Sequence, residues 1–315
     1  MYKFMFSPLI SIIIPVYNGS KYMKEAVNSA LNQAYKHKEV IVVDDGSTDD
    51  SWQIIESYGQ NIRAFRQKNG GVSTALNLGI KQAKGEYISW LSHDDVYVPN
   101  KLSKQIEALN NLPVEKRGGT ILFSNYKIID LNSKVIEVPA IEKVHNLSKF
   151  SCSLYPVLKG LIYGCTLLIP KKCFIENGYF DPGLRTSQDY DLWFKFFQKY
   201  PIHFQTDYLL LSRRHSEQGT FSQRATDESN TLWLKMLQET ADSDKIAIDG
   251  SLQNFYLRNY LQMKRVGYLE AATYSKKQLN SMMKFLAEPI FIIQQFWNQL
   301  KPFLAKILRV FRVLS

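Results

Sequence analysis

The sequence is poor in cysteine and has no long apolar run. Its three cysteines are too few and too irregularly spaced for a disulfide framework or a zinc site, so we expect small buried residues in a reducing compartment. No stretch of about 18 or more apolar residues is present, which leaves no obvious membrane-spanning helix. The apolar start is interrupted by Pro8 and has no small-residue cleavage site, which predicts a first strand rather than a signal peptide.

Several motifs typical of other nucleotide-using proteins are also absent. No G-x-G-x-x-G follows the first predicted strand, which disfavours a dehydrogenase. A Gly-rich basic loop for a nucleotidyltransferase and a Gln-x-x-Arg-Trp motif for a processive polysaccharide synthase are both missing. The net charge of +10, from 39 basic and 29 acidic residues, fits nucleic acid, a membrane surface or anionic substrates. Because no nucleic-acid motif accompanies this charge, we favour membrane and phosphate and expect no nucleic-acid partner.

The first third of the chain alternates between strand and helix patterns. The predicted strands are 10–15, 39–43, 62–65 and 87–91, and the predicted helices are 20–33, 49–58 and 72–84. Short links between them indicate parallel strands joined by right-handed crossovers. Later in the chain we expect strands over 121–124 and 166–169, a helix over 188–200, and only helices beyond about 225.

These patterns predict an α/β fold with a mostly parallel central sheet flanked by helices, followed by a C-terminal helical extension. We expect a domain over 1–224, with a nucleotide-binding half over about 8–98 and an acceptor half over about 99–224, and the extension over 225–315.

Two acidic clusters each close a predicted strand. Residues 42–49 read VVDDGSTD, and residues 90–95 read WLSHDD. The carboxyl ends of strands in an open α/β sheet are where ligands bind. Asp44 and Asp45 are therefore candidates for accepting hydrogen bonds from a base and a ribose, with Pro15, Tyr17 and Asn18 as the neighbouring wall. The alternative is an Asx-turn and helix cap, since Asp-Gly-Ser-Thr-Asp is also good turn chemistry.

The second cluster suits a divalent cation. Mg²⁺ and Mn²⁺ prefer hard oxygen ligands and share their coordination with substrate phosphates and water. Asp94 or Asp95, at the end of a strand, meets that need. A capped turn is the competing interpretation, because Pro99 begins a helix shortly afterwards.

Two further segments carry chemistry. Asp189 opens an amphipathic helix whose dipole favours the ionised carboxylate that a general base requires, whereas Asp191 is more simply a first-turn charge. The alternative for both acids is a helix cap.

The segment over residues 213–222 is basic. Its two arginines and His215 are able to clamp a diphosphate, and His215 is also a candidate metal ligand. The competing interpretation is a basic surface loop.

Together these segments resemble family 2 glycosyltransferases, which have the A-type nucleotide-diphospho-sugar transferase fold. The resemblance covers roughly residues 8–222 and is carried by SIIIPVYNGSKYMKEAVNSALNQ, VIVVDDGSTDDS, NGGVSTALNLGIKQAKGEYISWLSHDD, GYFDPGLRTSQDYDLW and RRHSEQGTFS. The four motifs described above occur in order and at family-like spacing, which makes the resemblance specific. It implies transfer of a sugar from a nucleotide diphosphate, normally with inversion, and a Mn²⁺ or Mg²⁺ cofactor.

The resemblance also implies roles for individual residues. Asp94 takes the place of the family's metal-binding acid and Asp189 that of the base that deprotonates the acceptor hydroxyl. The implied nucleotide contacts are Pro15, Tyr17, Asn18, Asp44, Asp45, Asn77 and Asp94. The implied diphosphate or acceptor contacts are Arg214, His215, Gly164 and Arg185. Many relatives have a carboxylate at Ser92 or His93, and this chain does not, so the choice between Asp94 and Asp95 as metal ligand, with His215 beside them, stays open.

The tail over 290–314 is amphipathic, with aromatic and aliphatic residues opposite glutamines and basic residues. This composition is typical of an interfacial helix on an anionic leaflet. A helix packed on the catalytic domain or in an oligomer is the equal alternative. We expect a cytoplasmic protein, peripheral at the inner face of the cell membrane if the tail binds lipid.

The function expected is non-processive transfer from a nucleotide sugar, most simply a UDP-sugar, to a glycan or lipid-linked acceptor in cell-surface polysaccharide synthesis. A non-catalytic nucleotide-sugar binder and a nucleotidyltransferase are the alternatives.

Overall fold

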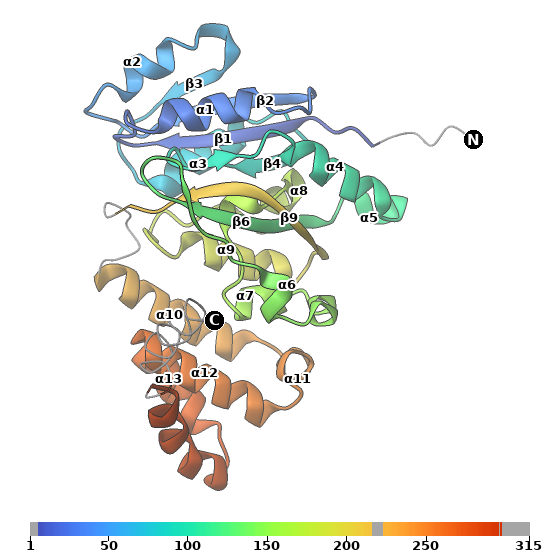
Figure 1. Ribbon diagram of the computed structural model, residues 1–315, viewed down its shortest axis with the longest axis vertical. Helices are drawn as coiled ribbons and strands as arrows, with labels where there is room; N and C mark the ends of the chain where they lie inside the picture. The colour runs from blue at the N-terminus through green and yellow to red at the C-terminus, as the bar shows by residue number, and fades with distance from the viewer. Residues whose placement is uncertain (1–5, 216–222, 296, 298–315) are drawn as a thin grey trace, which may run out of the picture. The chain divides into compact units, whose positions relative to one another are not determined.

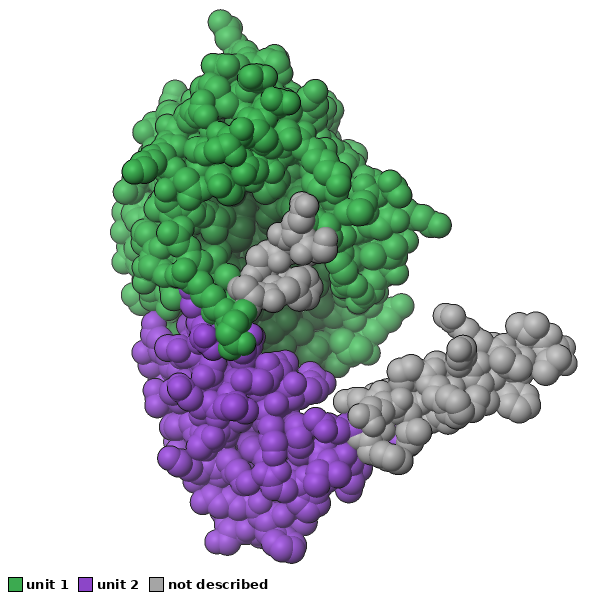
Figure 2. All heavy atoms as spheres, turned by 90° about the vertical axis from the view of Figure 1, so that its left-hand side faces the viewer, with its two compact units in different colours: residues 1–225 green, residues 226–315 purple. Residues whose placement is uncertain are grey.

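The computed structural model describes residues 6–215, 223–295 and 297. The chain divides into two compact units, Met1–Ala225 and Thr226–Ser315. Figure 1 traces the elements and Figure 2 colours the two units. Each unit is described by itself below.

The first unit is built on a five-stranded sheet. Its strand order is β3-β2-β1-β4-β8, in which the first four strands are parallel and β8 is antiparallel to β4. The strands are β1 (Ile10–Val16), β2 (Lys38–Asp44), β3 (Arg63–Arg66), β4 (Tyr87–Trp90) and β8 (Ile169–Pro170). The four strands predicted in the first third of the chain are confirmed, as is their parallel arrangement.

Both faces of this sheet are covered by helices (Figure 1). All seven residues of β1 are buried, as its run of branched apolar side chains predicts. Ile12 and Ile14 belong to one buried cluster with the apolar face of α1 (Met23–Leu31). On the other face, α3 (Val72–Gln82) approaches closely because Gly79 lies against Ile13 and Val43. The remaining crossover helix is α2 (Ser51–Glu56).

The second sheet was largely missed by the sequence analysis. Its order is β5-β9-β6-β7, with β9 parallel to β6 and antiparallel to β5. The strands are β5 (Val96–Tyr97), β6 (Ile121–Ile129), β7 (Val135–Glu137) and β9 (Ile202–Arg213). The register of β6 against β9 shifts around Asn125, which breaks the alternation by which a strand is recognised. The prediction of a loop beginning at Arg213 was therefore wrong, because that residue ends β9.

A second correction concerns the strand expected over 166–169. Gly164–Thr166 forms a 3-10 turn, and β8 contains only Ile169 and Pro170. The other helices of this unit are α4 (Lys101–Asn111), α5 (Val114–Arg117), α6 (Ile141–Val144), α7 (Tyr155–Leu158), α8 (Lys171–Asn177) and α9 (Gln188–Phe197).

The chain is wholly helical from α10 to the end of its described part, as predicted. The helices are α10 (Gln223–Glu239), α11 (Asp242–Asp249), α12 (Leu252–Val266), α13 (Leu269–Lys277) and a helix over 281–295. Gly250 and Gly267 end α11 and α12 in the left-handed conformation, and Ser251 caps α12. None of the described helices is long and apolar enough to cross a membrane. Most of the amphipathic tail predicted over 290–314 lies outside the described residues.

The close approach of α3 to the sheet gives a stability prediction. A Cβ on Gly79 would lie 2.5 Å from Cγ2 of Ile13, so Gly79→Ala should overpack the core. We expect the free energy of unfolding to fall by about 1–2 kcal/mol, after the gain in helix propensity is subtracted. Urea denaturation measures it. The matched control is Gly118→Ala, since a Cβ there meets nothing within 4 Å. Equal midpoints for both variants would show that the approach is not tight.

Candidate functional site

A cavity lies at the carboxyl ends of β1, β2 and β4. Its volume is about 170 Å³. It is lined by Pro15, Val16, Tyr17, Asp45, Val72, Ala75, Ser92, His93 and Asp94. Ligands bind at this edge of open α/β sheets because the strand ends and their loops leave a crevice there. The structure thus brings together four of the predicted nucleotide contacts, namely Pro15, Tyr17, Asp45 and Asp94.

The loops after β1 and β2 are tied to each other beside this cavity. Asn18 has a left-handed backbone, with φ of 47°. Its side-chain oxygen accepts a hydrogen bond from Thr48 N at 2.8 Å, and its own N–H donates to Oγ of Ser47 at 3.0 Å. These bonds fix the two loops that form one wall. They give Asn18 a positioning role in the protein itself, while a contact to nucleotide stays a prediction.

Asp44 and Asp45 are both engaged by neighbouring segments of the protein. Asp44 is fully buried and pairs with Nε of Arg66 at 2.9 Å. Asp45 accepts hydrogen bonds from Gly70 N at 2.9 Å and Gly71 N at 2.7 Å, which holds the loop before α3. The Asx-turn alternative is met by a different contact, in which Ser47 N donates to Oδ1 of Asp44 at 3.2 Å. Asp45 nevertheless lines the cavity, so the two interpretations are compatible for that residue.

Asp94 and His215 lie side by side. Oδ2 of Asp94 is 2.9 Å from Nε2 of His215, and each side chain is 13% exposed. Nδ1 of His215 is buried and has no hydrogen-bond partner among the described residues. An accessible carboxylate oxygen next to an imidazole nitrogen fits a divalent cation that takes its other ligands from phosphate and water. The described residues contain no group of three or more His, Cys, Asp and Glu arranged for a metal.

Asp95 is engaged by the protein on both oxygens. Oδ1 accepts from the backbone N–H of Arg213 and Oδ2 from the hydroxyl of Tyr163, each at 2.9 Å. Complete burial, together with the negative charge of Asp94, raises the pKa of its carboxyl. Asp94 lines the cavity and is 13% exposed, whereas Asp95 is fully buried.

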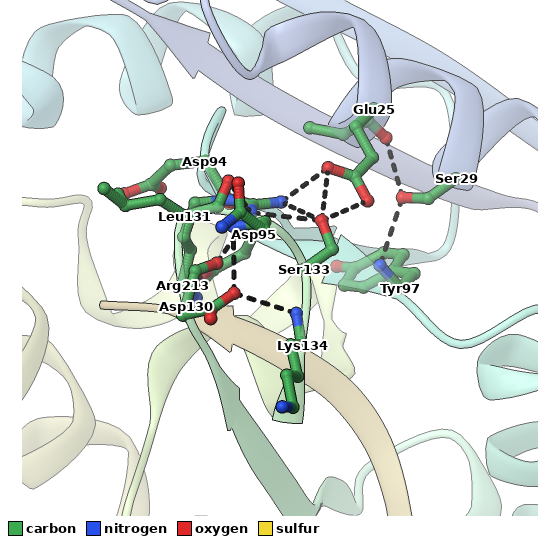
Figure 3. A network of polar contacts seen from close by, with 12 residues as sticks. Glu25, Ser29, Asp94, Asp95, Tyr97, Asp130, Leu131, Ser133, Lys134 and Arg213 are labelled. Atoms are coloured by element: carbon green, nitrogen blue, oxygen red, sulfur yellow. Dashed lines mark hydrogen bonds and ion pairs between the residues drawn. The ribbon is translucent and has the colours of Figure 1, made fainter. Parts of the chain in front are cut away.

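Arg213 is the buried centre of a polar network that the sequence analysis missed (Figure 3). Its side chain is 1% exposed. Nε donates to the carbonyl of Asp94 at 2.9 Å, Nη1 to the carbonyl of Asp130 at 3.0 Å, and Nη2 to Oε2 of Glu25 at 2.5 Å. Arg213 thus uses its donors to join α1, the β6–β7 turn and the second acidic motif. The neighbouring Arg214 is half-exposed and pairs with Glu137 at 3.0 Å.

Asp189 lies in the first turn of α9. Burial raises the pKa of its carboxyl to about 6, although backbone hydrogen bonds, including one from Tyr190 N, act in the opposite direction. The hydroxyl of Tyr190 bonds the backbone of Ile162, the residue before Tyr163. Since Tyr163 binds Asp95, a short chain of contacts connects the start of α9 to the second acidic motif.

Asp191 has a different environment from Asp189. Its carboxylate is paired with Nζ of Lys195 at 2.6 Å, one helical turn along α9. The sequence analysis expected a first-turn charge here, and the ion pair agrees with that expectation.

Three other predicted contacts have structural partners. A Cβ on Gly164 would lie 2.6 Å from the ring of Trp90, so the glycine admits the indole. Nη1 of Arg185 donates to the carbonyl of Gly70 at 2.7 Å. The amide of Asn77 bonds both the N–H and the carbonyl of Phe180. Each of the three residues thus has a contact within the protein, and ligand contacts by them stay predictions.

Comparisons with known proteins identify the family of this chain. The family model described as "Glycosyl transferase family 2" matches residues 11–130. An uncharacterised glycosyltransferase of Rickettsia prowazekii is 44% identical over 268 residues, which cover 85% of this chain and 83% of that protein. The chain spans only 48%, 40% and 42% of the length of similar proteins from Rickettsia conorii, Rickettsia bellii and Rickettsia felis.

Two solved structures share the fold. The mannosyltransferase PcManGT from Pyrobaculum calidifontis, in complex with GDP-Man and Mn²⁺, has a TM-score of 0.64 at 15% identity and covers 95% of this chain and 86% of its own. TarS of S. aureus, residues 1–349 in complex with UDP-GlcNAc, has a TM-score of 0.62 at 18% identity and covers 88% and 83%. These likenesses confirm the A-type fold expected from the sequence.

The network around Arg213 gives a second stability prediction. Arg213→Met leaves two partly buried carbonyls and a carboxylate without their donor, so we expect the free energy of unfolding to fall by roughly 2–4 kcal/mol. Arg214→Met, one residue away, removes only an exposed ion pair and should cost about 1 kcal/mol or less. Urea denaturation of both variants compares them. Similar losses would contradict the central role of Arg213.

Proposed function

This chain belongs to glycosyltransferase family 2, and from that membership we propose that it transfers a sugar from a nucleotide diphosphate sugar to an acceptor hydroxyl. The observation that carries the proposal is the cavity at the strand ends, which has Asp94 in its lining and His215 against that carboxylate. The nucleotide sugars bound to PcManGT and TarS support this class of donor. A UDP-sugar is the donor we propose.

Asp94 and His215 are the residues that would hold Mg²⁺ or Mn²⁺. When bound, the cation would neutralise negative charge on the nucleoside diphosphate leaving group. Asp95 would support the site indirectly, because its hydrogen bonds with Arg213 and Tyr163 fix the backbone next to Asp94. Pro15, Tyr17 and Asp45 would form the nucleotide side of the cavity.

Asp189 is the proposed general base. A base with a pKa near 6 is largely ionised at neutral pH and still accepts a proton as the acceptor oxygen attacks. The proton would pass from the acceptor hydroxyl to the Asp189 carboxylate while the sugar leaves the diphosphate. A single displacement of this kind inverts the anomeric centre and needs no covalent intermediate.

The acceptor we propose is a glycan or lipid-linked glycan used in cell-surface polysaccharide, extended non-processively at the cytoplasmic face of the membrane. The net charge of +10 and the amphipathic composition of residues 290–314 support a peripheral association with anionic lipid.

The metal assignment is tested by turnover. We expect release of nucleoside diphosphate from a screened set of nucleotide sugars to stop in chelator and to return with Mn²⁺. His215→Ala should raise the Mn²⁺ concentration for half-maximal activity about tenfold or more, because a ligand atom is lost. His37→Ala, an exposed histidine outside the site, is the matched control. Full activity in chelator would remove the metal from the proposal.

The base assignment is tested by rate and by pH. Asp189→Asn keeps the shape of the side chain but accepts no proton, so kcat should fall about 10²–10⁴-fold while donor affinity is kept. In the unsubstituted chain kcat/KM should fall as pH drops below about 6, since protonated Asp189 is inactive, and level off above it. Asp191→Asn is the matched control and should keep both rate and pH profile. A normal rate for Asp189→Asn would assign the base elsewhere.

A further inference from the structure

The second unit contains a basic cavity outside the proposed catalytic site. Its volume is about 410 Å³, and it lies among residues of α12, α13 and the helix over 281–295. Four lysines line it, Lys264, Lys276, Lys277 and Lys284, together with a single acid, Glu288. The lining therefore carries a strong excess of positive charge.

Ion pairs within the unit engage only two of the four lysines. Glu288 accepts from Nζ of Lys264 at 2.5 Å and from Nζ of Lys276 at 2.6 Å. These bonds hold the pKa of its carboxyl near 2, so the acid stays ionised and the two pairs stay formed. Lys277 and Lys284 are exposed and have no ion-pair partner among the described residues. Two ammonium groups thus remain to attract an anion to the cavity.

An exposed apolar stripe runs along the helix that carries Lys284. Met282, Phe285, Leu286, Ile292 and Ile293 are 66%, 79%, 39%, 64% and 66% exposed. Their spacing of three, four and seven residues places them on one face. The opposite face carries Ala287 and Phe291, which are buried and attach the helix to the unit. The helix therefore has two apolar sides. One packs against the rest of the unit, and the other is exposed.

We propose that the basic cavity and this apolar stripe together bind an anionic phospholipid of the membrane surface. The headgroup phosphate would enter the cavity between Lys277 and Lys284, and the stripe would lie at the boundary with the acyl chains. A positive cavity next to an exposed apolar face matches an amphiphilic anion better than a soluble phosphate, which leaves the stripe in water. A protein partner would need no basic cavity beside the stripe. The inference rests on the membrane association proposed above and names its site.

The test is co-sedimentation of the full chain with vesicles of phosphatidylcholine alone or mixed with phosphatidylglycerol. Binding should require phosphatidylglycerol. Lys277→Gln with Lys284→Gln should weaken the partition coefficient about 30-fold, from the usual contribution of a lysine at an anionic surface. Lys116→Gln with Lys143→Gln removes the same charge from exposed lysines of the first unit and is the matched control. Phe285→Ser should also weaken binding, and its exposure keeps folding intact.

Three results would overturn the proposal. The first is unchanged sedimentation of the Lys277 and Lys284 double variant. The second is saturable binding of inorganic phosphate to the cavity without vesicle binding, which would assign a soluble ligand. The third is a change of oligomeric state, rather than of sedimentation, in Phe285→Ser, which would assign a protein interface. Turnover with a soluble acceptor, measured on the same samples, should be equal in all variants, so failure of lipid binding is separable from failure of the sugar-transfer proposal.

Discussion

The geometry of the site depends on one buried cation, the guanidinium of Arg213. The backbone N–H of Arg213 donates to Oδ1 of Asp95, and its side chain donates to the carbonyl of Asp94. The same side chain holds Glu25 on α1 and the turn after β6 (Figure 3). Because β9 ends at Arg213, His215 follows two residues later and meets Asp94. His215, which follows the last residue of β9, is thereby placed next to the loop after β4.

The first acidic motif shows a related constraint. Its carboxylates shape the loops around the cavity, since Asp44 pairs with Arg66 and Asp45 holds the backbone at Gly70 and Gly71. Carboxylates that accept several donors pre-organise a site at little entropic cost on binding. Contacts within the protein and a place in the cavity lining are therefore compatible for Asp45, because those contacts position the loops around the cavity.

The parts of the fold that the sequence predicted are those determined by neighbouring residues. The strand at β1 is a continuous branched-apolar run, and both acidic motifs directly follow such runs. The parts that were missed depend on distant residues. Arg213 bonds Glu25 across 188 positions and Asp94 across 119, and nothing near Arg213 in the sequence indicates either partner. The raised pKa of Asp189 likewise comes from burial by the folded chain, which a motif does not encode.

The departure from the usual acidic pattern at Ser92 and His93 has a physical counterpart in the structure. His93 is turned against Gly19, where a Cβ would lie 2.6 Å from its ring, and burial lowers the pKa of its imidazole. Its ring therefore packs against the loop after β1 while it also lines the cavity. Asp95 is saturated by protein donors, so Asp94 is the carboxylate that remains, and His215 arrives from β9 beside it. In our proposal the imidazole thus supplies the second ligand atom that the motif itself lacks, which makes the end of β9 as important to the site as the loop after β4.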